Sequence, residues 1–280
     1  MRRRIEIGLE APGQEGAVLI APSPIAFWDQ QFEGFEVTGA YREVTATNSA
    51  QKAYLITPEA GVAPVLSYSF VSAPGALPAP EIWEGPDSAL TRASPDLAAL
   101  AGEFCAPTGT VAERLRGLIS HAAEMFDYDH PEERFNDGAE AVPTLCGTTK
   151  GSCVDINTFL LAGAKSVGIT GQYIMGYWFG PERFKTPDAH CWLVFQTPEG
   201  PLFWDVAHHL KWGVSPLGAG LNPAGGRRLA FSAGRGLAFD TPNCPITISH
   251  FGEPVWVLPD GRAYPPEITI TLTETVLEDA

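Results

Sequence analysis

The stretch GSCVDINTFLLAGA, residues 151–164, begins where a polar, glycine-containing loop gives way to a segment whose apolar side chains cover most of a helix circumference. This pattern is typical of a helix in the protein interior. A cysteine at the start of that helix, Cys153, would lie beside unpaired backbone N–H groups and the positive end of the helix dipole, which both favour thiolate over thiol. The small residues Gly151 and Ser152 would let a substrate backbone come close. We therefore interpret Cys153 as a nucleophile.

A base near this cysteine is required, because a free cysteine with a pKa of about 8.5 is mostly protonated at neutral pH. His190 lies on a predicted strand over residues 189–195, and Asp205 lies on the next predicted strand, over residues 202–206. The turn TPEG between them predicts a hairpin whose register places the two side chains next to each other near its open end. The sequence thus predicts Cys153 as the nucleophile, His190 as its base and Asp205 as the group that orients the base.

These motifs resemble those of the transglutaminase-like superfamily. Residues 151–169 are similar to the nucleophile helix of that family, and residues 173–177 are similar to the strand that follows it. The sequences AHCW at 189–192 and WD at 204–205 resemble the other two motifs of the family. The resemblance, to the bacterial transglutaminase-like cysteine peptidases with a papain-like fold, covers about residues 95–210.

The resemblance implies an α+β cysteine-protease fold, with a helix packed on an antiparallel sheet, and an acyl-enzyme pathway. In this pathway Cys153 attacks an amide carbonyl, His190 moves the proton to the leaving amine, and Asp205 holds the imidazole. The Cys153 backbone N–H supplies one oxyanion donor, and no second donor is assigned. Gln172, where many relatives carry an arginine, and Cys191, inside the histidine motif, depart from the family pattern and bear on substrate preference.

Helix signals occur at two places in the predicted catalytic region. Thr110, followed three residues later by Glu113, is a capping-box signal, and apolar residues recur at helical spacing from there to Phe126. Asp155 falls in the first turn of the nucleophile helix. We expect it to stabilise that turn through the helix dipole rather than to contact substrate.

Short segments rich in β-branched and aromatic residues dominate the first part of the chain and predict an antiparallel β domain over residues 1–80. The proline-rich segment 72–80 is interpreted as a linker to a catalytic domain over residues 81–280, with its core at about 95–210. Residues 212–236 are interpreted as a loop. The predicted strands outside the hairpin are 3–9, 17–21, 35–44, 53–57, 65–71, 172–179, 246–249, 254–258 and 267–274.

The composition is that of an acidic, globular chain, with 280 residues, 45% hydrophobic residues and a formal net charge of -15. This charge argues against a nucleic-acid partner, because phosphate binding rests on clustered lysine and arginine. No apolar segment approaches the roughly 18 residues that span a bilayer, and no signal-peptide core follows the arginines at 2–4. We predict a soluble, cytoplasmic protein that acts on a peptide or protein substrate, without a membrane partner; homo-oligomerisation is left open.

Other residues that could carry chemistry have weaker patterns. His208 and His209 with Cys191 or Cys244 could form a metal site, but CxxC and HExxH spacings are lacking, and adjacent histidines on a strand point to opposite faces. The sequence GGRR at 225–228 lacks the strand and helix that frame a phosphate loop. We therefore predict neither a metal ion nor a cofactor.

The predicted function is that of a thiol hydrolase, which cleaves peptide or isopeptide-like amide bonds through an acyl-enzyme on Cys153. One alternative is transfer of a protein-glutamine acyl group to an amine, as in a transglutaminase, which uses the same residues. Another is a non-enzymatic peptide-binding module that keeps the fold. Hydrolysis is preferred because the chain is short and lacks a DxDxDG calcium loop.

Overall fold

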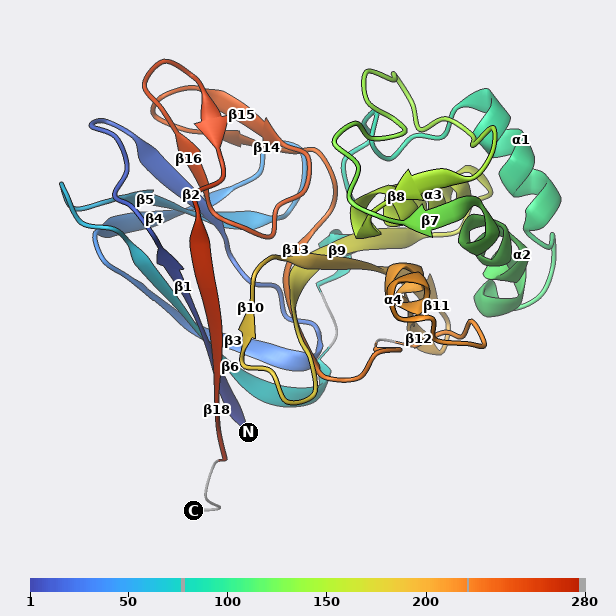
Figure 1. The fold of residues 1–280 in the computed structure, drawn as a ribbon, viewed down its shortest axis with the longest axis horizontal. Coiled ribbons are helices and arrows are strands. Elements are labelled where there is room, and N and C mark those ends of the chain that lie inside the picture. The colour runs from blue at the N-terminus through green and yellow to red at the C-terminus, as the bar shows by residue number, and fades with distance from the viewer. Residues whose placement is uncertain (77–78, 221, 277–280) are drawn as a thin grey trace.

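The computed structural model describes residues 1–76, 79–220 and 222–276. The chain forms a β-rich half and a half that contains the helices, and the two lie next to each other (Figure 1). Both ends of the described chain belong to the β-rich half, where the first strand pairs with the last.

The β-rich half is a sandwich of two five-stranded sheets, in the orders β10-β18-β1-β6-β3 and β17-β16-β2-β5-β4. Apolar side chains alternate along the strands, as in β1, so that one face of each sheet is buried against the other. The strands are β1 (Arg2–Leu9), β2 (Val18–Pro22), β3 (Trp28–Val37), β4 (Ala40–Thr45), β5 (Lys52–Thr57), β6 (Val65–Ala76), β10 (Lys185–Thr186), β16 (Val255–Val257), β17 (Ala263–Tyr264) and β18 (Ile268–Thr275).

The helical half is built on a four-stranded antiparallel sheet in the order β12-β11-β9-β13. Helix α3 is buried along almost its whole length, because it lies between this sheet and the other helices. The sheet strands are β9 (Gly171–Phe179), β11 (His190–Thr197), β12 (Gly200–Trp204) and β13 (Arg227–Ala233). The helices are η1 (Pro80–Trp83), α1 (Pro95–Phe104), α2 (Val111–Met125), α3 (Cys153–Ser166) and α4 (Val206–Trp212). The remaining strands are β7 (Phe126–Tyr128), β8 (Thr149–Gly151), β14 (Leu237–Asp240) and β15 (Pro245–Ile248).

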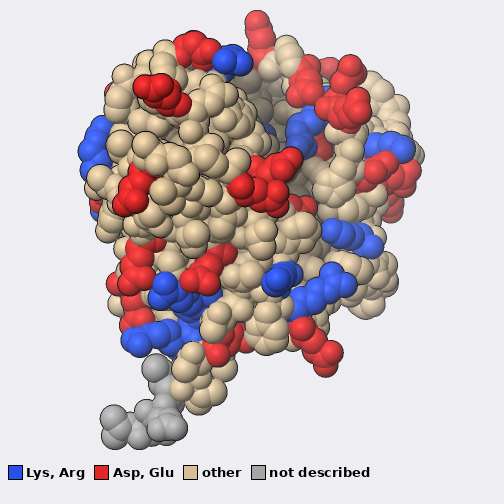
Figure 2. Space-filling model, turned by 60° about the vertical axis from the view of Figure 1, so that its left-hand side comes forward, with Lys and Arg blue, Asp and Glu red and all other residues tan. Residues whose placement is uncertain are grey.

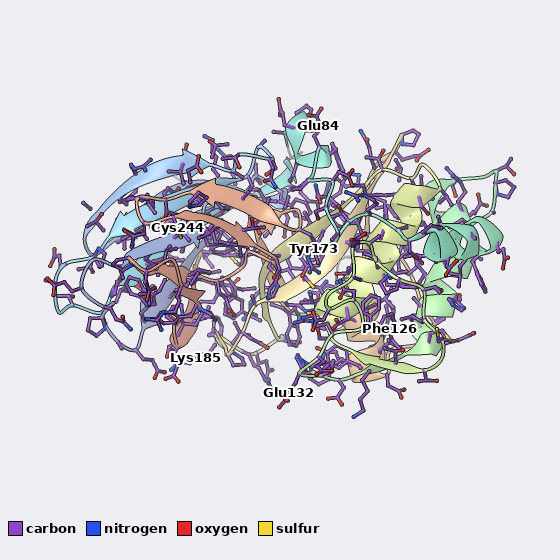
Figure 3. All side chains as sticks on the ribbon, turned by 90° about the horizontal axis from the view of Figure 1, so that it is seen from above. Glu84, Phe126, Glu132, Tyr173, Lys185 and Cys244 are labelled. Atoms are coloured by element: carbon purple, nitrogen blue, oxygen red, sulfur yellow. The ribbon has the colours of Figure 1, made fainter. Side chains whose placement is uncertain are left out.

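Strand β9 joins the two halves, because its side chains belong to both cores. Tyr173 and Met175 pack against the helices, whereas Tyr177 and Phe179 pack into the sandwich. Figure 3 shows Tyr173 near the centre of the molecule, with Phe126 in the helical half and Cys244 on the opposite side. This strand therefore links the helical half to the sandwich.

The predicted α+β class, with a helix on an antiparallel sheet, is confirmed. The capping box at Thr110 and the helix up to Met125 are also confirmed. Of the helices in the described residues, none is both long and apolar enough to cross a bilayer.

The expected strand over residues 35–44 is wrong, since it is split between β3 and β4. Gly39 turns the chain there with a φ of 112°, and a Cβ at this position would lie 2.6 Å from the Thr57 carbonyl oxygen. The linker expected over 72–80 is also wrong for its first residues, because β6 continues to Ala76 along β3. Residues 77–78 of that expected linker lie outside the described residues.

Two expectations near the site need correction as well. The strand expected over residues 202–206 ends at Trp204, because Asp205 caps the helix α4, which was not predicted. The loop expected over 212–236 contains β13, which pairs with β9 and buries Leu229 and Phe231 in the sandwich core. This strand supplies one wall of the candidate site.

The predicted division at residue 80 does not separate the sheets. Strands β16, β17, β18 and the short β10 all follow residue 80, yet they complete the two sheets that begin in the first 76 residues. Such pairing joins segments that are far apart in sequence, as Arg2 with Thr275. The β-rich half is therefore made by both ends of the chain and not by residues 1–80 alone.

Candidate active site

Cys153 is the first residue of α3, and its position is fixed by a capping box. The Ser152 side chain accepts a hydrogen bond from the Val154 N–H at 3.2 Å, and Asp155 Oδ2 accepts one from the Ser152 N–H at 2.8 Å. Arg134 Nη1 donates to the same carboxylate oxygen at 2.8 Å. Asp155 thus stabilises the first turn, as the sequence predicted, and holds the nucleophile loop in place.

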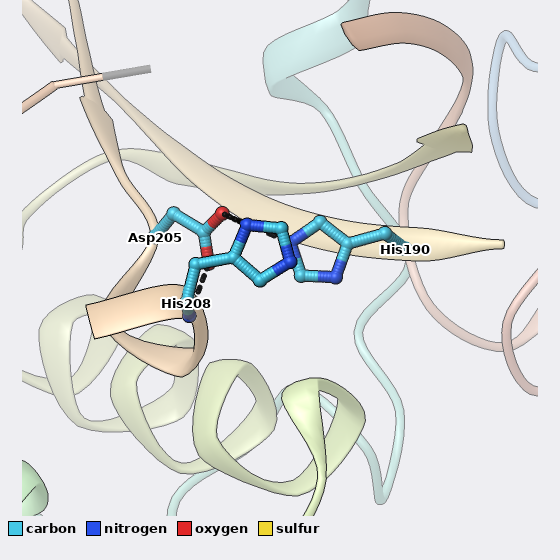
Figure 4. Close-up of side chains that lie close together, drawn as sticks. All are labelled: His190, Asp205 and His208. Atoms are coloured by element: carbon cyan, nitrogen blue, oxygen red, sulfur yellow. Dashed lines mark hydrogen bonds and ion pairs between the residues drawn. The ribbon is translucent and has the colours of Figure 1, made fainter. Parts of the chain in front are cut away.

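The structure brings His190 and Asp205 together through the predicted hairpin. Its register, from Leu193 with Trp204 to Thr197 with Gly200, places both residues beyond the last paired positions. His190 Nε2 donates a hydrogen bond to Asp205 Oδ2 at 2.9 Å (Figure 4). Because Asp205 occupies Nε2, the other ring nitrogen, Nδ1, is the atom that can exchange a proton with Cys153.

The side chains of Cys191 and His190 lie close enough to the Cys153 sulfur to influence the pKa of its thiol. The hydrogen bond from the Cys191 side chain holds the pKa of Cys153 well below its usual value; burial opposes this effect, and the His190 ring reinforces it. Burial keeps the pKa of Cys191 well above its usual value, so that this thiol stays a donor. All three predicted site residues are therefore in one cluster, and Cys191, singled out as a departure from the family pattern, belongs to it.

The surroundings of His190 favour the protonated form of its ring. Burial would lower its pKa, but the charge of Asp205 and the hydrogen bonds to Asp205 and Cys153 raise that pKa to about 9. Burial would likewise raise the pKa of Asp205, and the charges of His190 and Arg228 hold it below its usual value instead. At neutral pH the cluster therefore favours the ionised form of all three residues: the Cys153 thiolate, the His190 imidazolium and the Asp205 carboxylate.

Two residues that the sequence did not predict complete the far side of the site, Arg228 on β13 and His208 on α4. Arg228 Nη2 donates to Asp205 Oδ2 and, at 2.8 Å, to His208 Nδ1. The His208 ring stacks on His190 with centroids 3.8 Å apart and an angle of 8° between the planes. Burial, with the nearby charge of His190, lowers the pKa of His208, so this second ring stays neutral.

A local signal for His208 was present in the sequence. Asp205 is a preferred N-cap residue, and Gly213 follows the helix as a left-handed C-cap with φ of 62°. If this segment is interpreted as a helix, His208 lies one turn after Asp205. Asp205 Oδ1 accepts a hydrogen bond from the His208 backbone N–H at 3.0 Å. The assumption that His208 and His209 lie on a strand was wrong.

His190, Asp205 and His208 could offer three ligand atoms to a metal ion, since these atoms lie within 4.8 Å of one another. The guanidinium of Arg228, however, already contacts both Asp205 Oδ2 and His208 Nδ1. A cation there would have to displace a buried positive charge from its only acidic contact among the described residues. The donor set therefore suits proton transfer better than metal binding.

The thiol opens into a narrow cleft of about 30 Å³ between the two halves. This space admits a backbone group but not a large side chain. Trp178, one of its walls, packs edge-on against His208 with ring centroids 4.7 Å apart. Trp192 and Trp204, which also lie near the site, are buried core residues. The cleft walls come from both halves: Tyr128, His130, Trp178, Thr186, Asp188 and Lys211.

The family model of the transglutaminase-like superfamily matches residues 98–204. This segment contains Cys153 and His190 and ends one residue before Asp205. The resemblance seen in the sequence motifs is thus confirmed, and residues 98–204 form a transglutaminase-like core.

Among solved structures, the chain is similar to a candidate cysteine protease from Cytophaga hutchinsonii, with a TM-score of 0.55, 13% identity and 98% of each chain covered. The periplasmic domain of TgpA from Pseudomonas aeruginosa, bound to ethylmercury, matches with a TM-score of 0.42 and 17% identity over 75% of this chain and 91% of that one. A search of the curated proteins finds no match. At such low identity the first of these likenesses shows a shared fold over nearly the whole chain.

Proposed function

We propose that this protein is a thiol hydrolase that cleaves peptide or isopeptide-like amide bonds through an acyl-enzyme on Cys153. The observation that supports it most is the buried ring of His190, which hydrogen-bonds with Asp205 at 2.9 Å and lies close enough to Cys153 to lower the pKa of its thiol. A buried imidazole between a thiol and a carboxylate is the arrangement that makes a thiolate and then protonates a leaving group.

In the first step the Cys153 thiolate attacks the amide carbonyl, and a C–S bond forms. The resulting oxyanion accepts a hydrogen bond from the Cys153 backbone N–H at the start of α3. His190 gives its proton to the amine, the C–N bond breaks, and a thioester remains on Cys153. In the second step neutral His190 takes a proton from water, the hydroxide attacks the thioester, and the acid leaves as the thiolate re-forms.

Asp205 and Arg228, which do not line the cleft, support this cycle by setting the charge of His190, and neutral His208 stacks on the His190 ring at the wall of the cleft. Asp205 is fully buried and stays ionised, so it stabilises His190 each time the ring is protonated. Arg228 and the N-terminus of α4 hold that carboxylate in one orientation. A cytoplasmic location, where such thiols stay reduced, remains a prediction.

Turnover of a library of fluorogenic peptide amides, with Cys153→Ala as the inactive control, tests this function. The expected rate rises as Cys153 becomes a thiolate and falls near pH 9, because His190 then loses the proton that the leaving amine needs. Masses of the products, with and without an added primary amine, separate the alternatives. An acid product supports hydrolysis, a new amide supports acyl transfer, and binding of peptides without turnover supports a binding module.

A further inference from the structure

A second cavity, of about 270 Å³, lies next to the strand that carries His190. It is bounded by Met175 of β9, the end of β15 and the loop that contains His250 and Glu253. Met175 pairs with Cys191 across the sheet, which places the cavity close to the nucleophile cluster. The proposed reaction does not involve this cavity.

The loop at this cavity is held firmly against the active site. Tyr177 Oη donates to the Gly252 carbonyl at 2.7 Å, and a Cβ on Gly252 would lie 2.4 Å from Met175 and 3.0 Å from Ala189. The next residue, Glu253, accepts a hydrogen bond from the Ala189 N–H through Oε1 at 2.9 Å. The carboxylate of Glu253 is thus positioned by the residue directly before His190.

Glu253 lacks a positive partner. In the described part of the chain no lysine, arginine or histidine forms an ion pair with it. Burial raises the pKa of Glu253; the hydrogen bond from the Ala189 N–H opposes this, and the charge of Asp188 adds a smaller increase. His250 does not supply the missing charge, because burial and two nearby arginines lower its pKa to about 4. A partly buried carboxylate without a counter-charge is costly, and a bound cation would offset that cost.

The two arginines that influence His250 are engaged elsewhere. Arg235 Nε donates to the Ser249 carbonyl at 2.8 Å, and its Nη1 donates to Thr158. Arg134 is paired with Asp155. Neither arginine is therefore available to neutralise Glu253.

The rest of the cavity suits the stem of a long cationic side chain. Met175, Ile248 and Val255 provide apolar contacts, and the half-exposed ring of Tyr264 offers a face to a positive group. Figure 2 shows acidic side chains at the rim of a hollow on one face of the molecule and a basic side chain inside it. The net charge of -15 favours the approach of cations to the molecule as a whole.

We propose that this cavity is a substrate subsite for a lysine-like or arginine-like side chain, whose cation binds the carboxylate of Glu253. The subsite rests on the proposed thiol chemistry, since it would select the peptide presented to Cys153. The narrow cleft above Cys153 would hold the peptide backbone, and the cationic side chain would extend past His250 into the cavity.

Two matched peptidyl acyloxymethyl ketones, one with lysine and one with norleucine, test the proposal by their rates of Cys153 alkylation. We expect the wild type to react about tenfold faster with the lysine probe, because an ion-paired hydrogen bond is lost with norleucine. Glu253→Gln keeps an acceptor for the Ala189 N–H but removes the charge, so the preference should vanish. Glu59→Gln, at an exposed carboxylate in the β5–β6 turn, should keep it.

Iodoacetamide, which needs only the thiolate, separates the two proposals. Fast labelling of Cys153 by iodoacetamide with equal rates for both peptidyl probes would overturn the subsite and leave the thiol chemistry intact. Slow labelling by all three reagents would overturn the thiol chemistry on which the subsite rests. In the wild type the lysine preference should also fall as the salt concentration rises, and a preference insensitive to salt would contradict an ionic subsite.

Discussion

The groups on the two sides of the His190 ring differ in whether their charge can change during the reaction. On one side lie two thiols, of which Cys153 ionises and Cys191 stays neutral, and the cleft opens on this side. On the other side, Asp205 and Arg228 are fixed charges buried against each other. The sulfur side therefore supplies the reacting atoms, whereas the Asp205 side sets the charge of the ring.

Removal of the charge on the Asp205 side has the largest expected effect. Asp205→Asn keeps the shape of the side chain, but it removes the charge that stabilises protonated His190 and leaves Arg228 unpaired. We expect the turnover of peptide amides to fall by about 10³-fold to 10⁴-fold. Steady-state kinetics measure this, with circular dichroism to confirm folding, and a folded variant with a loss under tenfold would show that the Asp205 side is dispensable.

Arg228→Met tests whether the guanidinium stabilises the protein through Asp205. Breaking this buried pair should cost about 3 kcal/mol or more of unfolding free energy at pH 7. The pKa of Asp205 is held low in the folded state, so this stability is present above the ordinary carboxyl pKa of about 3.9 and is lost as the pH falls further. Urea unfolding of the wild type and of Arg228→Met, at pH 7 and at pH 3, measures the loss of stability at each pH.

The control for this prediction is Arg92, which forms an ion pair with Asp87 on the surface of the molecule. Arg92→Met should cost less than about 1 kcal/mol, because both side chains of this ion pair are exposed to water. Equal losses in the two variants, or a loss in Arg228→Met that grows toward pH 3, would contradict the assigned role of the Asp205 pair.

On the sulfur side, Cys191→Ala removes the thiol that donates to Cys153. The pKa of Cys153 should rise, and its alkylation at pH 6 should slow about tenfold, since a hydrogen bond to a charged atom is lost. Alkylation at pH 10 should be unchanged. Cys191→Ser, which restores a donor, should recover most of the rate, and an unchanged profile in the alanine variant would exclude Cys191 from the cluster.

The smallest expected effect comes from the two capping boxes, at Ser152 on α3 and at Thr110 on α2. Ser152→Ala should lower the unfolding free energy by about 1 kcal/mol and also slow alkylation of Cys153, because the helix start that favours the thiolate loosens. Thr110→Ala should affect stability alone. Thermal unfolding and alkylation of both variants would show whether only the cap of α3 influences the reactivity of Cys153.

The sequence predicted Cys153, His190 and Asp205 better than Arg228 and His208, for a physical reason. Cys153 lies where a loop gives way to an apolar helix pattern, and His190 and Asp205 are joined by one tight turn, so short-range patterns suffice. Arg228 reaches Asp205 only because β13 pairs with β9, a contact between segments that no local pattern connects. The pairing of β1 with β18 was missed for the same reason, whereas α4 had a local cap signal that was assigned to a strand.

The central claim is a thiolate–imidazolium pair between Cys153 and His190, and pH-dependent iodoacetamide labelling tests it most directly. Mass spectrometry reads each cysteine separately, and the exposed Cys146 serves as a reference in the same molecule. Cys153 should label faster than Cys146 well below pH 8, and His190→Ala should reduce that advantage, since the thiolate then loses the hydrogen bond and the positive charge of the His190 ring. Equal labelling of the two cysteines in the wild type, or a profile of Cys153 unchanged by His190→Ala, would contradict the pair.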